Sequence, residues 1–221
     1  IPASGHPVAY MPPGVEDSVI VNPANIASIT QTLDANEDVA AIIVEANGAH
    51  WGTVPLQNPD FLLSLQEICR ARGVVFILDE VVTGFRLSRG GAQGRWGVTP
   101  DLTTFGKIVS GGEPGAAVGG RKEIMEMLAI TGDPSWDDHR RVSQGGTFNA
   151  NPTSAAAGIA CLKAIRDEPI NETADGTAET LKLGLNKTFE SLGITGHAHG
   201  VSSIVHINLG FDCRCDREIC T

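Results

Sequence analysis

The residues best suited to chemistry in this sequence are one lysine and one aspartate, each near the end of a predicted strand. Lys107 stands in DLTTFGKIVSGGEPG, after a β-branched and aromatic run and before a glycine cluster. Asp79 lies near the end of the apolar run VVFILDE. A buried lysine amine can stay neutral and trap carbonyl groups, because burial lowers its pKa. A buried aspartate needs a proton-bearing partner, and a protonated pyridine nitrogen is one.

A structural role competes with the chemical one for each residue. Lys107 can be a solvated lysine in a turn, and Asp79 can cap a following helix, although VVTGFRLSRGG does not resemble a helix start. A phosphate loop of the GxxxxGK[ST] type is excluded, because Asp101 and Ile108 occupy its glycine and hydroxyl positions. A carbonyl-trapping lysine remains, while spacing alone leaves the role of Asp79 open.

Other candidates are weaker. Thr147 in QGGTFNANP fits either a turn or a phosphate contact beside the N-terminus of the next helix. His50 and Trp51 follow the first predicted strand, where packing is favoured over lining a substrate pocket. HAH at 197–199 has no acidic or cysteine partner at ligand spacing, and CRCDREIC lacks paired zinc spacing, so we predict no metal site. The sequence also lacks the GxSxG, HExxH and GxGxxG motifs.

The elements that must position Lys107 and Asp79 follow an α/β pattern with a largely parallel sheet. The apolar runs 39–45 and 74–80 are typical of strands buried on both faces, and a helix from Asn58 to Gly73 separates them. Ligands gather beyond the carboxyl ends of parallel strands, so Glu45, Asp79 and Lys107 are expected to converge there. Beyond these we expect a helix at 26–33, a glycine-rich loop at 83–100, strands at 102–106 and 115–120, helices at 121–129, 153–165 and 172–192, and a strand at 201–209.

Composition limits the class of protein. The chain has 221 residues, of which 42% are hydrophobic and 19% charged, so it can bury a core. Its net charge of −10 argues against binding to nucleic acid or to anionic membranes. No apolar run approaches the roughly 18 residues of a membrane span, and no signal peptide is visible. The odd number of cysteines, 5, predicts reduced thiols and a cytoplasmic location. Because the chain starts at Ile1 and stops after a strand-like run, we expect a piece of a larger protein.

Three motifs, in this order, resemble class III pyridoxal-phosphate aminotransferases, most closely the branch of glutamate-1-semialdehyde aminomutases. They are LDEVVTGFR (78–86), GGAQGRWGVTPDLTTFGKIVSGGEPGAAVGGRKEIM (90–125) and GGTFNANPTSAAAG (145–158). The likeness covers most of residues 39–165. It implies the large domain of fold-type I, with a mostly parallel sheet, in residues 1–166, and the start of an α+β small domain in 167–221, both incomplete.

The resemblance also implies a cofactor, pyridoxal 5'-phosphate, and roles for four residues. Lys107 resembles the lysine that forms the internal aldimine, a Schiff base, and moves the substrate proton. Asp79 resembles the partner of the pyridine nitrogen, and Val81 the side chain against one ring face. Thr147 resembles the phosphate-binding threonine that reaches into a neighbouring subunit's site, which implies a homodimer with shared active sites.

The implied activity is transamination from a small amine or amino acid to a keto or aldehyde acceptor. Two alternatives stay open: an intramolecular aminomutase of the glutamate-1-semialdehyde type, and a catalytically degenerate domain that only binds. The segment EANGAHWG (45–52) departs from the aminomutase pattern, and Glu45-Ala46 stands where the family usually has Glu-Pro. No match to the family's phosphate-cradling loop or to its aromatic stacking residue is found in this chain.

Overall fold

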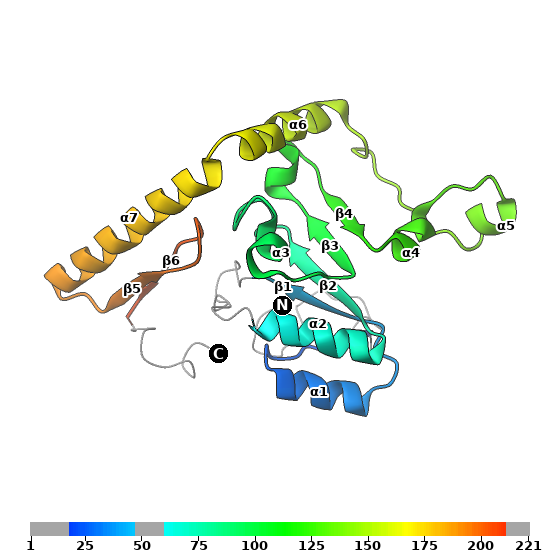
Figure 1. Cartoon of the computed structure of the whole chain (residues 1–221), viewed down its shortest axis with the longest axis horizontal. Helices are drawn as coiled ribbons and strands as arrows, with labels where there is room; N and C mark the ends of the chain where they lie inside the picture. Colours follow the sequence, from blue (N-terminus) through cyan, green and yellow to red (C-terminus); the bar gives the residue numbers. More distant parts are fainter. Residues whose placement is uncertain (1–17, 47–59, 211–221) are drawn as a thin grey trace.

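A four-stranded sheet forms the framework of the molecule in a computed structural model that describes residues 18–46 and 60–210. Strands β1 (Ala41–Glu45), β2 (Val75–Glu80), β3 (Leu102–Phe105) and β4 (Ala117–Gly120) lie in that order (Figure 1). The first three are parallel and β4 runs antiparallel to β3. The predicted α/β class with a mostly parallel sheet is confirmed, and so are these four strands.

Two helices cover one face of this sheet and form the core with it. Helices α1 (Ile26–Ala35) and α2 (Asp60–Arg72) lie on the same side of the strands (Figure 1). The core consists of apolar side chains from α1, α2, β2 and the segment that follows β2, among them Leu33, Leu62, Leu65, Phe76, Leu78 and Leu87. Alternation along β2 turns every second side chain, including Phe76 and Leu78, toward α2. Asp79 therefore belongs to the opposite face of the sheet.

The expectation that β1 is buried on both faces is wrong for this structure. Ile43, in the middle of the strand, is 62% exposed. Among the described residues, β1 is an edge strand that pairs only with β2, and the helices α1 and α2 cover just one of its faces. The apolar run thus predicted the strand correctly, but it wrongly predicted that both faces of the strand are buried.

The segment from Thr83 to Pro100, expected as a loop, contains a short helix, α3 (Gly91–Trp96). Its start is held by Glu80, whose side chain is fully buried at 0% exposure. Glu80 Oε2 accepts hydrogen bonds from Ala92 N at 2.7 Å and Thr83 Oγ1 at 2.9 Å, and Oε1 accepts from Gln93 N at 3.2 Å. An acid at the end of β2 does cap a helix, but it is Glu80 and not Asp79.

Replacing Glu80 with alanine is expected to destabilise the protein by about 3 kcal/mol or more, because it leaves several buried donors without an acceptor. The free energy of unfolding in urea measures this effect. Glu113→Ala, at an exposed position, is the matched control and should change stability by less than about 0.5 kcal/mol. Equal stabilities for the two variants would show that the buried carboxylate does not hold α3.

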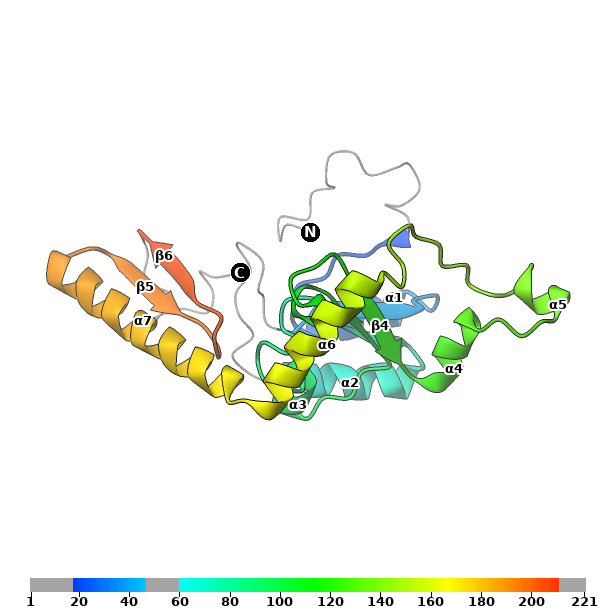
Figure 2. The same ribbon diagram turned by 90° about the horizontal axis from the view of Figure 1, so that it is seen from above.

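The rest of the chain carries two groups of elements on opposite sides of the sheet (Figure 2). Three short helical segments lie on one side, α4 (Lys122–Met125), η3 (Glu126–Leu128) and α5 (Pro134–Asp137). Helix α6 (Pro152–Asp167) then leads to α7 (Ile170–Leu192) and to a separate antiparallel sheet of β5 (Gly196–His199) and β6 (His206–Leu209). β5 was not expected, and the strand predicted at 201–209 is shorter than predicted.

The chain between α6 and α7 changes direction at Glu168, which is extended, and at Pro169. This break falls close to the predicted boundary between residues 166 and 167, and the division into two domains stays a prediction. In the described part of the chain, no helix is both long enough and apolar enough to cross a bilayer.

Candidate active site

Asp79 is held at the carboxyl end of β2 by two donors. Its Oδ1 accepts a hydrogen bond from Val81 N at 2.9 Å and from Thr104 Oγ1 at 3.1 Å. Thr104 is the partner of Asp79 in the β2–β3 register, so both side chains share one face of the sheet. Within residues 18–46 and 60–210, Oδ2 of this half-buried carboxylate accepts no hydrogen bond, so it is free to meet a proton-bearing group.

Val81 and Gly106 bring the ends of β2 and β3 together. Gly106 is buried and follows β3 directly. A Cβ placed on Gly106 would lie 3.2 Å from Val81 Cγ1, tighter than an ordinary van der Waals contact. The absence of a side chain at Gly106 therefore lets the backbone that leads to Lys107 approach Val81, and with it the strand that carries Asp79.

Lys107 begins the 3-10 turn η2 (Lys107–Ser110) with φ of +51°. This left-handed conformation is uncommon for a residue with a side chain and costs about 1 kcal/mol, so it persists only where the surroundings impose it. The side chain of Lys107 is exposed, which corrects the expectation that burial would keep its amine neutral.

Helix α6 fixes the backbone of η2 through two glycines. A Cβ on Gly158 of α6 would lie 2.5 Å from Val109 O, and one on Gly111 would lie 2.4 Å from Ala157 O. Ser154 Oγ also donates to Pro114 O at 2.7 Å. The segment that follows Lys107 therefore rests directly on α6 at Gly158 and Ser154, whereas Ala155, Ala156 and Ala160 of the same helix are exposed.

Gly158→Ala is expected to destabilise the protein by about 1–3 kcal/mol, because the added methyl group must push η2 away from α6. Gly176→Ala, in the interior of α7, is the matched control, since a Cβ there meets nothing within 4 Å. This second change should stabilise the protein by up to about 1 kcal/mol through helix propensity. Thermal unfolding of both variants tests the opposite signs. A stabilised Gly158→Ala variant would contradict the close packing of α6 on η2.

Thr147 lies apart from this group. It sits in an exposed turn ahead of α6 and, in the part of the chain that the structure describes, forms no hydrogen bond with Asp79 or Lys107. Asn151 caps α6, and its Oδ1 accepts from Thr153 N at 2.9 Å and Ser154 N at 3.3 Å. These two N–H groups are therefore already paired, and a phosphate at Thr147 would depend on the threonine itself. Its role stays a prediction.

Glu45 does reach the same edge of the sheet, as expected. It is the partner of Asp79 in the β1–β2 register. It also lies close to His206 of β6: burial lowers the pKa of His206, while the carboxylate of Glu45 acts in the opposite direction. Glu45 thus links the sheet edge to the C-terminal hairpin. His50 and Trp51, which follow it in sequence, lie outside the described residues.

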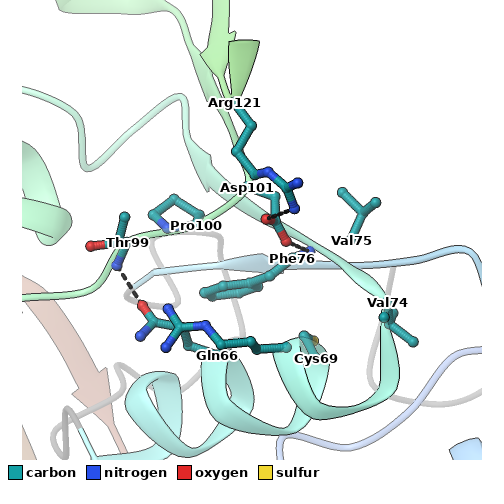
Figure 3. A pocket seen from close by; sticks show the side chains of 11 residues that line it. Gln66, Cys69, Val74, Val75, Phe76, Thr99, Pro100, Asp101 and Arg121 are labelled. Carbon is teal, nitrogen blue, oxygen red and sulfur yellow. Dashed lines mark hydrogen bonds and ion pairs between the residues drawn. The ribbon is translucent and has the colours of Figure 1, made fainter. Parts of the chain in front are cut away.

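A cavity of about 350 Å³ lies at the opposite end of the strands and is not part of this group (Figure 3). Asp101 closes one side by accepting hydrogen bonds from Phe76 N at 2.8 Å and Arg121 Nη1 at 3.0 Å. Cys69 lies beneath it, and burial raises the pKa of its thiol to about 11, so this thiol stays protonated at neutral pH. Because Asp101 stands at the start of β3 and Lys107 just after its end, the cavity is separated from Lys107 by the length of that strand.

Comparison with known families places these residues in context. The model of the family described as aminotransferase class-III matches residues 3–209. A glutamate-1-semialdehyde 2,1-aminomutase of Methanococcoides burtonii is 37% identical over 202 residues, covering 88% of this chain and 46% of that protein. The same-named protein of Chloroherpeton thalassium is 40% identical over 188 residues, covering 82% and 41%. The chain therefore spans less than half the length of these curated relatives.

Solved structures give the same answer for the fold. An omega-transaminase from Sphaerobacter thermophilus superposes with a TM-score of 0.81 at 36% identity, over 91% of this chain and 45% of its own. A transaminase with PLP bound superposes with a TM-score of 0.77 at 28% identity, over 91% and 46%. The predicted likeness to the large domain of pyridoxal-phosphate transferases is confirmed at the level of the fold.

Proposed function

We propose that this chain, which belongs to the class-III aminotransferase family, is part of a pyridoxal-phosphate-dependent aminotransferase. The enzyme moves an amino group between a small amine or amino acid and a keto or aldehyde acceptor. The observation that supports this most directly is the pairing of an oriented carboxylate on β2 with a lysine just beyond β3. Asp79 and Lys107 are joined across the strand ends by the contact of Val81 with Gly106.

The described residues fit pyridoxal phosphate. Asp79 has one carboxylate oxygen held by Val81 N and Thr104 Oγ1, and its other oxygen is available to face a protonated ring nitrogen. The side chain of Val81 beside the bare backbone of Gly106 suits one face of a flat ring. When bound, the cofactor supplies an electron sink that stabilises negative charge on the substrate carbon.

Each residue of the chain then has a defined task. Asp79 keeps a proton on the ring nitrogen, because its negative charge stabilises the cationic ring. The two donors to its Oδ1 keep the carboxylate oriented while the other oxygen does this. Lys107 Nζ, on an exposed side chain just beyond β3, would hold the cofactor in the resting enzyme. Once the amino group of the substrate has displaced it, the freed amine would take the proton from the substrate carbon and return it during transfer.

The wider assembly is also part of the proposal. Thr147, exposed ahead of α6, serves the phosphate group in the site of a second copy, which makes the protein a homodimer with shared active sites. The division at residue 166 into a large and a small domain, and a cytoplasmic location, complete the proposal.

The names of the curated relatives favour one alternative, an aminomutase that rearranges a single substrate. The need for an external amino acceptor separates the two activities. In the full protein that carries this chain, a transaminase consumes an added keto acid or aldehyde in proportion to the amino donor. Rearrangement at full rate without any acceptor would overturn the transaminase and support the aminomutase. Binding of the cofactor without turnover of any amine would support a domain that only binds.

A further inference from the structure

The loop that follows β2 is tied to elements much later in the chain. Asn171, at the start of α7, donates from Nδ2 to Phe85 O at 2.9 Å and to Arg86 O at 3.4 Å. Ser202, between β5 and β6, places its Oγ 3.2 Å from Leu87 O. Three consecutive carbonyl groups of one loop thus lie within hydrogen-bond distance of two side chains 85 to 115 positions away, although the single hydroxyl proton of Ser202 is shared between Leu87 O and Asp175 Oδ1, which lies nearer at 2.5 Å. We call Asn171 and Ser202 the brace.

The braced loop holds a strained residue. Phe85 has φ of +60°, a left-handed conformation that is unfavourable for an aromatic residue. Below the loop, Gly84 N donates to Glu80 O at 2.9 Å and Arg86 N to Thr83 O at 3.0 Å. The brace holds the same loop through its carbonyl groups, because Asn171 donates to Phe85 O and Arg86 O. Because such strain persists only where surrounding contacts impose it, the amide of Asn171 is one of the groups that hold Phe85 in place.

Phe85 in turn contacts the end of the strand that leads to Lys107. Its ring lies 5.7 Å from the ring of Phe105, centroid to centroid, with the planes tilted by 35°. A Cβ on the neighbouring Gly84 would lie 3.0 Å from Phe105 Cδ1, so the loop packs closely on that ring. Phe105 is the last residue of β3, two positions before Lys107. A change in the conformation of the braced loop would therefore move Phe105 and, with it, the backbone that leads to Lys107.

We propose that Asn171 is a positioning residue for Lys107. It touches no reacting atom; it acts by holding Phe85, and through Phe105 it restricts the backbone that carries the amine. Without the amide donor, the carbonyl groups of Phe85 and Arg86 lose their partner and Phe85 relaxes toward an ordinary conformation. Lys107 then presents its amine less often in the productive geometry. The inference rests on the function proposed above, because it assigns Lys107 the reaction with a carbonyl group.

Asn171→Asp is the sharpest variant for a test. It keeps the size of the side chain but replaces the donor with a carboxylate that faces two carbonyl oxygens. At the start of α7 an aspartate favours the helix, since it complements the helix dipole. Oδ1 of Asn171 is itself buried without a hydrogen-bond partner among the described residues, so the carboxylate loses the brace contact at a cost in stability, and far-UV circular dichroism must first show that the variant is folded. Asn171→Ala removes the donor without adding charge. Thr177→Ala is the control, because in residues 18–46 and 60–210 the side chain of the exposed Thr177 donates a hydrogen bond only to Thr173 O, within α7.

The first measurement uses the cofactor-free protein. Amide hydrogen exchange at residues 84–88 should become about tenfold faster in both Asn171 variants, and should stay unchanged in Thr177→Ala. The second measurement mixes each protein briefly with pyridoxal phosphate, reduces it with borohydride and quantifies labelled Lys107 by mass spectrometry. The initial rate of labelling should fall about fivefold or more in the Asn171 variants and stay at the wild-type value in the control.

Each outcome bears on a distinct claim. Exchange at the wild-type rate in both Asn171 variants would overturn the brace. Faster exchange with unchanged labelling of Lys107 would show that the contact is structural only, which also overturns the positioning role. If Lys107 of the wild-type protein is not labelled at all, the proposed function fails first, and the exchange measurement still decides whether Asn171 holds the loop.

Discussion

Replacing Lys107 with alanine is expected to abolish the visible absorption band of the lysine-bound cofactor and to lower turnover by at least about 10³-fold. In the proposed function the amine of Lys107 has two tasks, holding the cofactor and moving the substrate proton, so one substitution is expected to remove both. The backbone of Lys107 lies in a left-handed turn at φ of +51°. Alanine also has a Cβ atom, so the substitution neither adds nor relieves strain at this position. Titration with pyridoxal phosphate followed by absorbance, together with steady-state rates, measures both effects.

A second lysine separates this role from a general loss of positive charge. Lys122 of α4 has a side chain that is 83% exposed, and it pairs with Glu126 at 3.5 Å. Lys122→Ala should keep the band and the rate within about twofold. If Lys107→Ala kept the band while Lys122→Ala lost it, the assignment of the cofactor lysine would be wrong.

Asp79→Asn is expected to lower turnover by about 10²- to 10³-fold while the cofactor stays bound. Asparagine can still accept the hydrogen bonds from Val81 N and Thr104 Oγ1 through its amide oxygen, so the strand ends keep their geometry. It loses the negative charge that keeps a proton on the ring nitrogen, and the electron sink weakens. The result should appear as a lower kcat with little change in affinity for the cofactor.

Thr104→Val is the partner experiment for this carboxylate. It removes one of the two donors to Asp79 Oδ1 but keeps the charge. The loss of rate should be smaller than for Asp79→Asn, about tenfold or less, because Val81 N still orients the side chain. Turnover of Asp79→Asn at the wild-type rate would refute the electron-sink role.

Several features were predictable because their signals are local. The apolar runs ending at Glu45 and Glu80 identified β1 and β2, and the parallel order of these strands placed Asp79 beside Glu45. The small residues between Thr153 and Ile165 indicated a helix, and Gly158 of α6 packs closely on Val109 O, but the prediction of tight packing along the whole helix is wrong for the described residues, because Ala155, Ala156 and Ala160 are exposed. In each case a short stretch of sequence carries the physical cause.

Other features depend on contacts between distant residues, and no local pattern reveals them. Helix α3 begins where it does because Glu80, 12 positions earlier, accepts the N–H of Ala92. The exposure of Lys107 depends on what packs around η2 and not on its own neighbours in sequence. Asn171 meets Phe85 O across 86 positions. The positive φ of Phe85 could not be predicted from the sequence either, because the adjacent Gly84 is the residue that would be expected to adopt such a conformation.

The motif resemblance supplied what spacing alone left open. Spacing allowed Asp79 to be either a helix cap or the partner of a ring nitrogen, and the structure assigns the cap to its neighbour Glu80. Val81 gained its predicted role only through the resemblance, and that role stays a prediction; the structure shows that a Cβ on Gly106 would lie 3.2 Å from Val81 Cγ1. Thr147 rests on the resemblance alone, and a second copy of the chain is needed to test it.

The most direct test of the account is to map the lysine that carries the cofactor. The holoprotein is reduced with borohydride, digested and analysed by mass spectrometry, with Lys107→Ala treated in parallel. We predict that the pyridoxyl group is found on Lys107 in the wild-type protein and on no lysine in the variant. A pyridoxyl group on Lys122, Lys163, Lys182 or Lys187, or none on the wild-type protein, would contradict the central claim.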